Sequence, residues 1–123
     1  MKRDYKMYID DILESMNKIQ KYISGLEYEE FTQKNMVIDA VIRNLEIIGE
    51  ASKYVPEDVR VRYSDIPWGK MVGLRNVVIH GYFGVDLSIV WEIITKNIPE
   101  VKSLIENALE DVKNKNNRGN NDI

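Results

Sequence analysis

The chain has 123 residues, 44% of them hydrophobic, which suffices for one compact core and is too short for two domains. Its 17 Lys and Arg residues against 20 Asp and Glu residues give a net charge of −3, so we do not expect a broad basic surface that binds nucleic acid through counterion release, and any such contact must be local. The absence of cysteine excludes disulfides, thiolate metal sites and cysteine nucleophiles. Neither a secretion signal nor a long uncharged apolar run occurs, so we expect a cytoplasmic protein without a membrane span.

The N-terminal half of the chain predicts two amphipathic helices. The first covers residues 4–24 and ends at Gly25, which suits a left-handed helix cap. Residues 26–31 predict a short connection, and Thr32 is the predicted N-cap of a second helix over 32–54. The first helix is predicted from apolar residues at the spacing of one helical face, namely Ile9, Ile12, Leu13, Met16, Ile19 and Ile23.

A charged stripe follows one side of the predicted second helix. Its members recur at steps of three and four residues and carry both signs: Asp39, Arg43, Glu46, Glu50 and Lys53. The stripe is compatible with a solvated helix face and also with one wall of an active cleft.

The C-terminal half predicts a short helical turn within 56–63 and a third helix over 67–80 that starts at Pro67. Asp86 is the predicted N-cap of a last helix, whose apolar face continues to Val112. Pro99 lies inside that helix and cannot donate a backbone hydrogen bond to Thr95. We therefore expect a kink or break near Pro99.

The predicted fold class is all-α, an antiparallel bundle of four to five helices. Strand-like alternation and internal repeats are absent from the sequence. Residues 113–123 are almost entirely polar, so their burial cannot offset the entropy lost on ordering. We therefore predict one helical domain over residues 1–112, followed by a disordered polar tail over 113–123.

Candidate chemistry is concentrated at the end of the predicted third helix. His80 is the chain's single histidine, so one subunit cannot form a site with two or three histidine ligands, and we predict no metal. Arg75 binds phosphate well, His80 titrates near neutrality, and Tyr82 adds a phenol, all within eight residues. The chain is expected to change direction near His80, which would let the three converge. Alternatively, His80 caps its helix and Arg75 pairs with a carboxylate of the second helix.

At this segment the sequence resembles a known family. The string Arg75-Asn76-Val77-Val78-Ile79-His80-Gly81-Tyr82 is similar to the Arg-x4-His-x-Tyr signature of HepT-like ribonuclease toxins in the HEPN superfamily. The resemblance extends to the block Arg43-Asn44-Leu45-Glu46-Ile47-Ile48-Gly49-Glu50-Ala51 in the second helix and to Ile66-Pro67-Trp68 before the third.

The resemblance implies a HEPN-like helical bundle that forms a homodimer and cleaves RNA as an endoribonuclease, without metal or cofactor. It implies a catalytic pair of Arg75 and His80, with Asn76 as a polar helper, and Glu50 in the shared block becomes a supporting residue. It also implies a toxin–antitoxin system in which an MntA-type nucleotidyltransferase antitoxin attaches AMP to Tyr82.

Cleavage without a metal needs a base, an acid and positive charge at the phosphate. Each chain holds one histidine, so a twofold dimer would supply two histidines and two arginines to one cleft. One alternative is a non-catalytic helical module that binds a nucleotidyltransferase partner or a nucleotide; another is a purely structural bundle.

Several further side chains are candidates for RNA contact. Three aromatic residues could stack on bases or belong to the core: Trp68, Phe83 and Trp91. Three cations could bind RNA phosphates or be plain surface charges: Lys53, Arg60 and Arg62.

Overall fold

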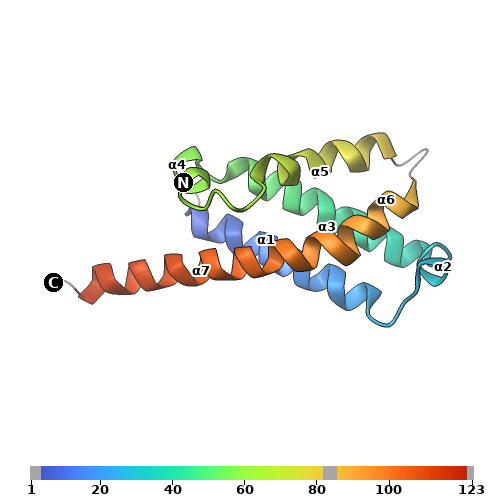
Figure 1. The fold of residues 1–123 in the computed structure, drawn as a ribbon, viewed down its shortest axis with the longest axis horizontal. Helices are drawn as coiled ribbons and strands as arrows, with labels where there is room; N and C mark the ends of the chain where they lie inside the picture. The colour runs from blue at the N-terminus through green and yellow to red at the C-terminus, as the bar shows by residue number, and fades with distance from the viewer. Residues whose placement is uncertain (1–3, 82–85, 122–123) are drawn as a thin grey trace.

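The structure is a computed structural model that describes residues 4–81 and 86–121, with side chains for 4–76 and 86–115. Within these ranges the secondary structure is helical and includes no strand, which confirms the predicted all-α class. The elements in chain order are α1 (Tyr5–Ile23), α2 (Tyr28–Phe31), α3 (Asn35–Tyr54), α4 (Glu57–Arg62), α5 (Trp68–Gly81), α6 (Leu87–Glu92), the π-helical η1 (Ile93–Asn97) and α7 (Ile98–Asn121) (Figure 1).

The long helices form an antiparallel bundle in which α3 packs against α1 and α5, and α7 packs along α1 (Figure 1). Four apolar residues of the predicted first helix are completely buried in the common core: Ile9, Ile12, Met16 and Ile19. Leu13 and Ile23 are partly buried at its edge. The 3.6-residue periodicity thus identified the buried face of α1 correctly.

The connection from α1 to α3 differs from the prediction in detail. Gly25 has φ +78°, the left-handed conformation expected after α1. The segment predicted as a plain connection contains the short helix α2, and the Glu27 N–H donates to the Glu30 carboxylate at 3.0 Å. Thr32 ends α2 rather than beginning α3, because its hydroxyl donates to the Glu29 carbonyl at 2.7 Å. The α3 helix therefore begins at Asn35.

Arg60 has a structural use at the corner between α3 and α4. Its Nε donates to the Val55 carbonyl at 3.0 Å, and its Nη2 donates to the carbonyls of Ser52 at 2.7 Å and Lys53 at 2.9 Å. The last carbonyls of a helix lack partners within the helix, and a cation there also suits the helix dipole. The guanidinium thus caps α3, which gives Arg60 a structural role that does not depend on RNA binding.

A hydrogen bond between Tyr63 and Asp111 connects the segment before α5 to α7. The Tyr63 hydroxyl donates to Asp111 Oδ2 at 2.5 Å, while the Tyr63 carbonyl accepts from Trp68 Nε1 at 3.1 Å. Burial, reinforced by Asp111, raises the pKa of the Tyr63 phenol to about 12. The hydrogen bond from Tyr63, followed by contact with Lys115, lowers the pKa of the Asp111 carboxyl.

Replacing Tyr63 by phenylalanine should return the pKa of the Asp111 carboxyl toward its ordinary value, because the largest stabiliser of the carboxylate is lost. A depressed pKa stabilises the fold above the ordinary carboxyl pKa, and this contribution disappears as pH falls through the lower native value. An NMR titration of Asp111 measures the change, and Lys115→Gln should produce a smaller one. An identical Asp111 titration in wild type and Tyr63→Phe would contradict this prediction.

The predicted irregularity near Pro99 is present as one π-helical turn. Asp86 caps α6 as predicted, accepting from the Ser88 N–H at 3.0 Å. In η1 the Ile98 N–H donates to the Ile93 carbonyl, five residues back. This wider turn immediately precedes Pro99, whose missing N–H and bulky ring disfavour regular α-helical bonding.

The last helix of the structure extends into the segment predicted as a polar tail. Helical backbone continues from Ile98 through Asn121, beyond the predicted end at Val112. Asp111 and Lys115 form an ion pair at 3.2 Å across the predicted boundary, at the i,i+4 spacing that supports helix. Charge pairing along the helix surface favours helical backbone past Val112, where few residues are apolar.

Candidate active site on the α3 and α5 surface

The site begins with a close approach of two helices at Gly49. This residue is buried on α3, and a Cβ built there would lie 3.2 Å from the Arg75 backbone nitrogen and 3.3 Å from the Met71 carbonyl oxygen. Both neighbours are backbone atoms of α5, which cannot turn aside as side chains do. Glycine therefore permits the contact that places Glu50 beside Arg75.

Arg75 and Glu50 form an ion pair at the surface. Arg75 Nη1 donates to Glu50 Oε2 at 3.2 Å, and the side chains are 53% and 45% exposed. Solvent screens a pair this exposed, so it contributes at most about 1 kcal/mol to stability. Arginine has five N–H donors, so one bond to Glu50 can orient the guanidinium and leave capacity for a phosphate. The bond to Glu50 confirms the alternative in which Arg75 pairs with a carboxylate of the second helix.

Asn76 and His80 occupy the same side of α5. They are four residues apart in a continuous helix, and Arg75 lies about 100° around the axis from Asn76. The Asn76 side chain is exposed. The helix continues through Gly81, one residue past its predicted end, and the expected change of chain direction falls outside the described residues. The His80 side chain and all of Tyr82 lie outside the described residues, and their predicted roles stay predictions.

The two tryptophans belong to the packing of the fold. Trp68 is 6% exposed and its indole N–H is bonded to Tyr63. Trp91 is partly buried, with its ring centroid 5.1 Å from that of Phe31 and 6.1 Å from that of Tyr28. Neither ring is free to stack on a base, and Phe83 lies outside the described residues.

The predicted charged stripe follows the outer side of α3, and Glu50 is the member paired with α5. Asp39, Arg43, Glu46 and Lys53 are exposed. Sequence reasoning missed Tyr54, which directly follows Lys53 and stacks on Tyr8 of α1 with ring centroids 5.6 Å apart. Its position one helical turn after Glu50 was the available signal.

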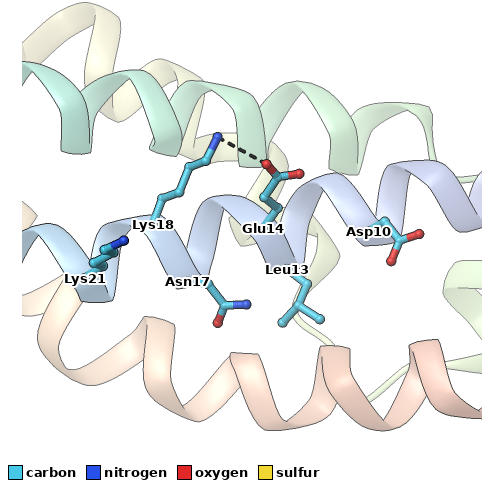
Figure 2. A pocket seen from close by; sticks show the side chains of 6 residues that line it. All are labelled: Asp10, Leu13, Glu14, Asn17, Lys18 and Lys21. Carbon is cyan, nitrogen blue, oxygen red and sulfur yellow. Dashed lines mark ion pairs between the residues drawn. The ribbon is translucent and has the colours of Figure 1, made fainter.

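Of the surface depressions among the described residues, the two larger ones lie away from the Arg75–Glu50 pair. Figure 2 shows the first, a shallow one on α1 where Leu13 and Asn17 point toward one neighbouring helix and Lys18 pairs with Glu14 at 3.2 Å. The second is a mainly apolar groove of about 600 Å³ between α5 and the η1–α7 segment. It includes Met71, Leu74, Ile93 and Val101. Neither depression is lined by Arg75 or Glu50.

The described part of the chain offers neither a metal-binding cluster nor a membrane-spanning helix. There, no group of three or more His, Cys, Asp or Glu side chains is arranged to hold a metal ion. No helix in the same part is both long and apolar enough to cross a membrane.

Comparisons with known proteins point to one family. Residues 12–108 match the family described as "Ribonuclease HepT-like". The chain is 46% identical over 105 residues to "Putative RNase MJ1380" of Methanocaldococcus jannaschii, covering 85% of this chain and 96% of that protein. It is 41% identical over 106 residues to "Probable ribonuclease HepT" of Thermococcus cleftensis, covering 86% and 96%. No solved structure is a significant match. The family match covers most of the chain, and the chain therefore belongs to the HepT-like ribonuclease family.

Proposed function

We propose that this protein is the toxin of a toxin–antitoxin system and cleaves RNA as a metal-independent endoribonuclease. Family membership supports the activity. The observation that carries the site is the half-exposed Arg75 guanidinium, which is bonded to Glu50 of α3 and belongs to the same helix as Asn76 and His80. A guanidinium in this setting can bind a phosphodiester and stabilise the added negative charge of its transition state.

The proposed reaction needs one proton removed and one supplied. A neutral His80 takes the proton of the ribose 2′-hydroxyl, whose oxygen attacks the adjacent phosphorus. The bond to the 5′-oxygen breaks, and a protonated histidine gives that oxygen its proton. The products are a 2′,3′-cyclic phosphate and a free 5′-hydroxyl. Arg75 holds the phosphate oxygens, and Asn76 is available as a polar helper on the His80 side of α5.

The proposed active form is a homodimer with both copies of Arg75 and His80 around one cleft. Each chain has a single histidine, and a twofold axis would supply the acid and the base from two copies. Light scattering at assay concentration should give twice the 14.4 kDa chain mass. A monomer that is fully active would overturn the shared cleft.

Control of the toxin is proposed to come from a nucleotidyltransferase antitoxin of the MntA type. The Tyr82 oxygen would attack the α-phosphate of ATP, pyrophosphate would leave, and the phenol proton would pass to solvent. The attached phosphodiester adds negative charge near Arg75 and so disfavours RNA. With antitoxin, ATP and magnesium, the Tyr82 peptide should gain AMP, and Tyr82→Phe should not. Full inhibition without any mass change would favour simple occlusion by the bound partner.

The central test is incubation of the purified protein with RNA in EDTA, with His80→Ala in parallel. Cleavage by wild type alone supports the proposal, whereas cleavage that needs added magnesium contradicts it. The second candidate is a non-catalytic module that binds the nucleotidyltransferase or a nucleotide through Arg75. The Arg75–Glu50 pair is compatible with it, since a phosphate could replace the carboxylate without chemistry. Binding without cleavage by the wild type would favour this module.

A further inference from the structure

An aromatic and basic surface lies beside the candidate site. Tyr8 of α1 and Tyr54 of α3 stack with ring centroids 5.6 Å apart and an interplanar angle of 24°. Lys53 Nζ lies over the Tyr54 ring, 5.9 Å from its centroid. Tyr54 is 52% exposed. We call these three residues, Tyr8, Lys53 and Tyr54, the tyrosine platform.

The tyrosine platform adjoins the Arg75–Glu50 pair along α3. Tyr54 is four residues after Glu50, so the two share the outer side of the helix at an axial distance of about 6 Å. Lys53 lies between them in the sequence and is itself exposed. The Arg75 guanidinium reaches this side of α3 to bond Glu50.

Tyr54 is held in place in the free protein although half of it faces solvent. Tyr8 supports its ring, and tyrosine loses few rotamers when it is ordered. The Lys53 ammonium occupies the ring surface through a cation–π contact, which is weak in an exposed position. A planar base could therefore displace the ammonium, which would then be free to pair with a neighbouring phosphate.

We propose that the tyrosine platform is a stacking subsite for an unpaired RNA base next to the phosphate bound by Arg75. This inference rests on the proposed ribonuclease function, because that function makes RNA the ligand of Arg75. Base stacking on an aromatic ring tolerates every base, so the subsite favours single-stranded RNA without choosing a sequence. A net charge of −3 disfavours RNA binding through a broad basic surface, so a local aromatic ring and cation would contribute a larger share of the affinity.

The test measures binding of single-stranded oligouridylate to the full chain carrying His80→Ala, in EDTA, by fluorescence anisotropy. In that background, Tyr54→Ala should weaken binding roughly 5- to 100-fold. Tyr54→Phe should keep the affinity, because the ring is retained. Tyr22→Ala is the matched control: Tyr22 is also an exposed tyrosine on the bundle surface, 38% exposed at the other end of α1, and its loss should leave binding unchanged.

Abasic oligonucleotides separate stacking from a general structural effect. Placing one abasic residue at each position in turn should reveal a position where the loss equals that of Tyr54→Ala, and the two losses should not add. Lys53→Gln should reduce the slope of log affinity against log salt by about 0.7, the value for one phosphate contact on a single strand. Additive losses at every position, or unchanged binding by Tyr54→Ala, would overturn the subsite.

Cleavage assays distinguish this inference from the proposed function. Tyr54→Ala with an intact His80 should raise KM for RNA and change kcat less. If the wild type binds RNA through Tyr54 but does not cleave it, the subsite stands and the ribonuclease proposal fails. If cleavage depends on His80 and is equal in wild type and Tyr54→Ala, the ribonuclease proposal stands and the subsite fails.

Discussion

RNA cleavage in EDTA should fall about 10²- to 10⁴-fold when His80 is replaced by alanine, because the reaction loses its proton-transfer group. Arg75→Ala should also be nearly inactive, since it removes the guanidinium assigned to hold the oxygens of the scissile phosphate. Arg75→Lys should rescue little, because an ammonium cannot bind two phosphate oxygens in the planar geometry of a guanidinium. Glu50→Ala should cost less than Arg75→Ala, because it frees the guanidinium without removing it.

Cleavage rates on labelled RNA, with circular dichroism to verify folding, measure these effects. Lys96→Ala is a suitable control, because this lysine is 74% exposed and pairs only loosely with Glu92 at 4.0 Å on another part of the surface. It should cleave RNA as the wild type does. A folded His80→Ala or Arg75→Ala protein with wild-type cleavage would rule out the assigned chemistry.

Two glycine-to-alanine substitutions should change stability in opposite directions. Gly49→Ala should lower the free energy of unfolding by about 1–3 kcal/mol, because the new methyl group presses on α5 backbone atoms that must move. Gly73→Ala should raise it by about 0.5–1 kcal/mol, because alanine favours helix and nothing lies within contact of the added Cβ. Both glycines lie in helices that form the candidate site.

Urea denaturation of both variants measures the difference. Gly49→Ala should also reduce RNA cleavage, because separation of α3 from α5 displaces Arg75 from Glu50, whereas Gly73→Ala should not. Equal stability of the two variants would mean that the close approach at Gly49 does not limit packing.

Much of the bundle could be predicted because capping and turn preferences indicate the same helices as the periodicity of the apolar residues. The apolar face of α1, the left-handed Gly25, the Asp86 cap and the disturbance before Pro99 each follow from nearby residues. The pairing of Arg75 with a second-helix carboxylate was also among the alternatives that the sequence offered, because the second helix carries a stripe of charged residues.

Other features depended on which helices became neighbours. Arg60 caps α3 only because α4 folds back over its last carbonyls, and the stacking of Tyr54 needs Tyr8, 46 positions earlier in the chain. Thr32 carries the sequence signature of an N-cap, yet the α2 turn uses its hydroxyl at a helix end. The sequence by itself determined helix type, approximate boundaries and buried faces, since these follow from residue periodicity and backbone preference. Only the tertiary structure decided which exposed side chains met between helices, because such contacts depend on interhelical distance and register.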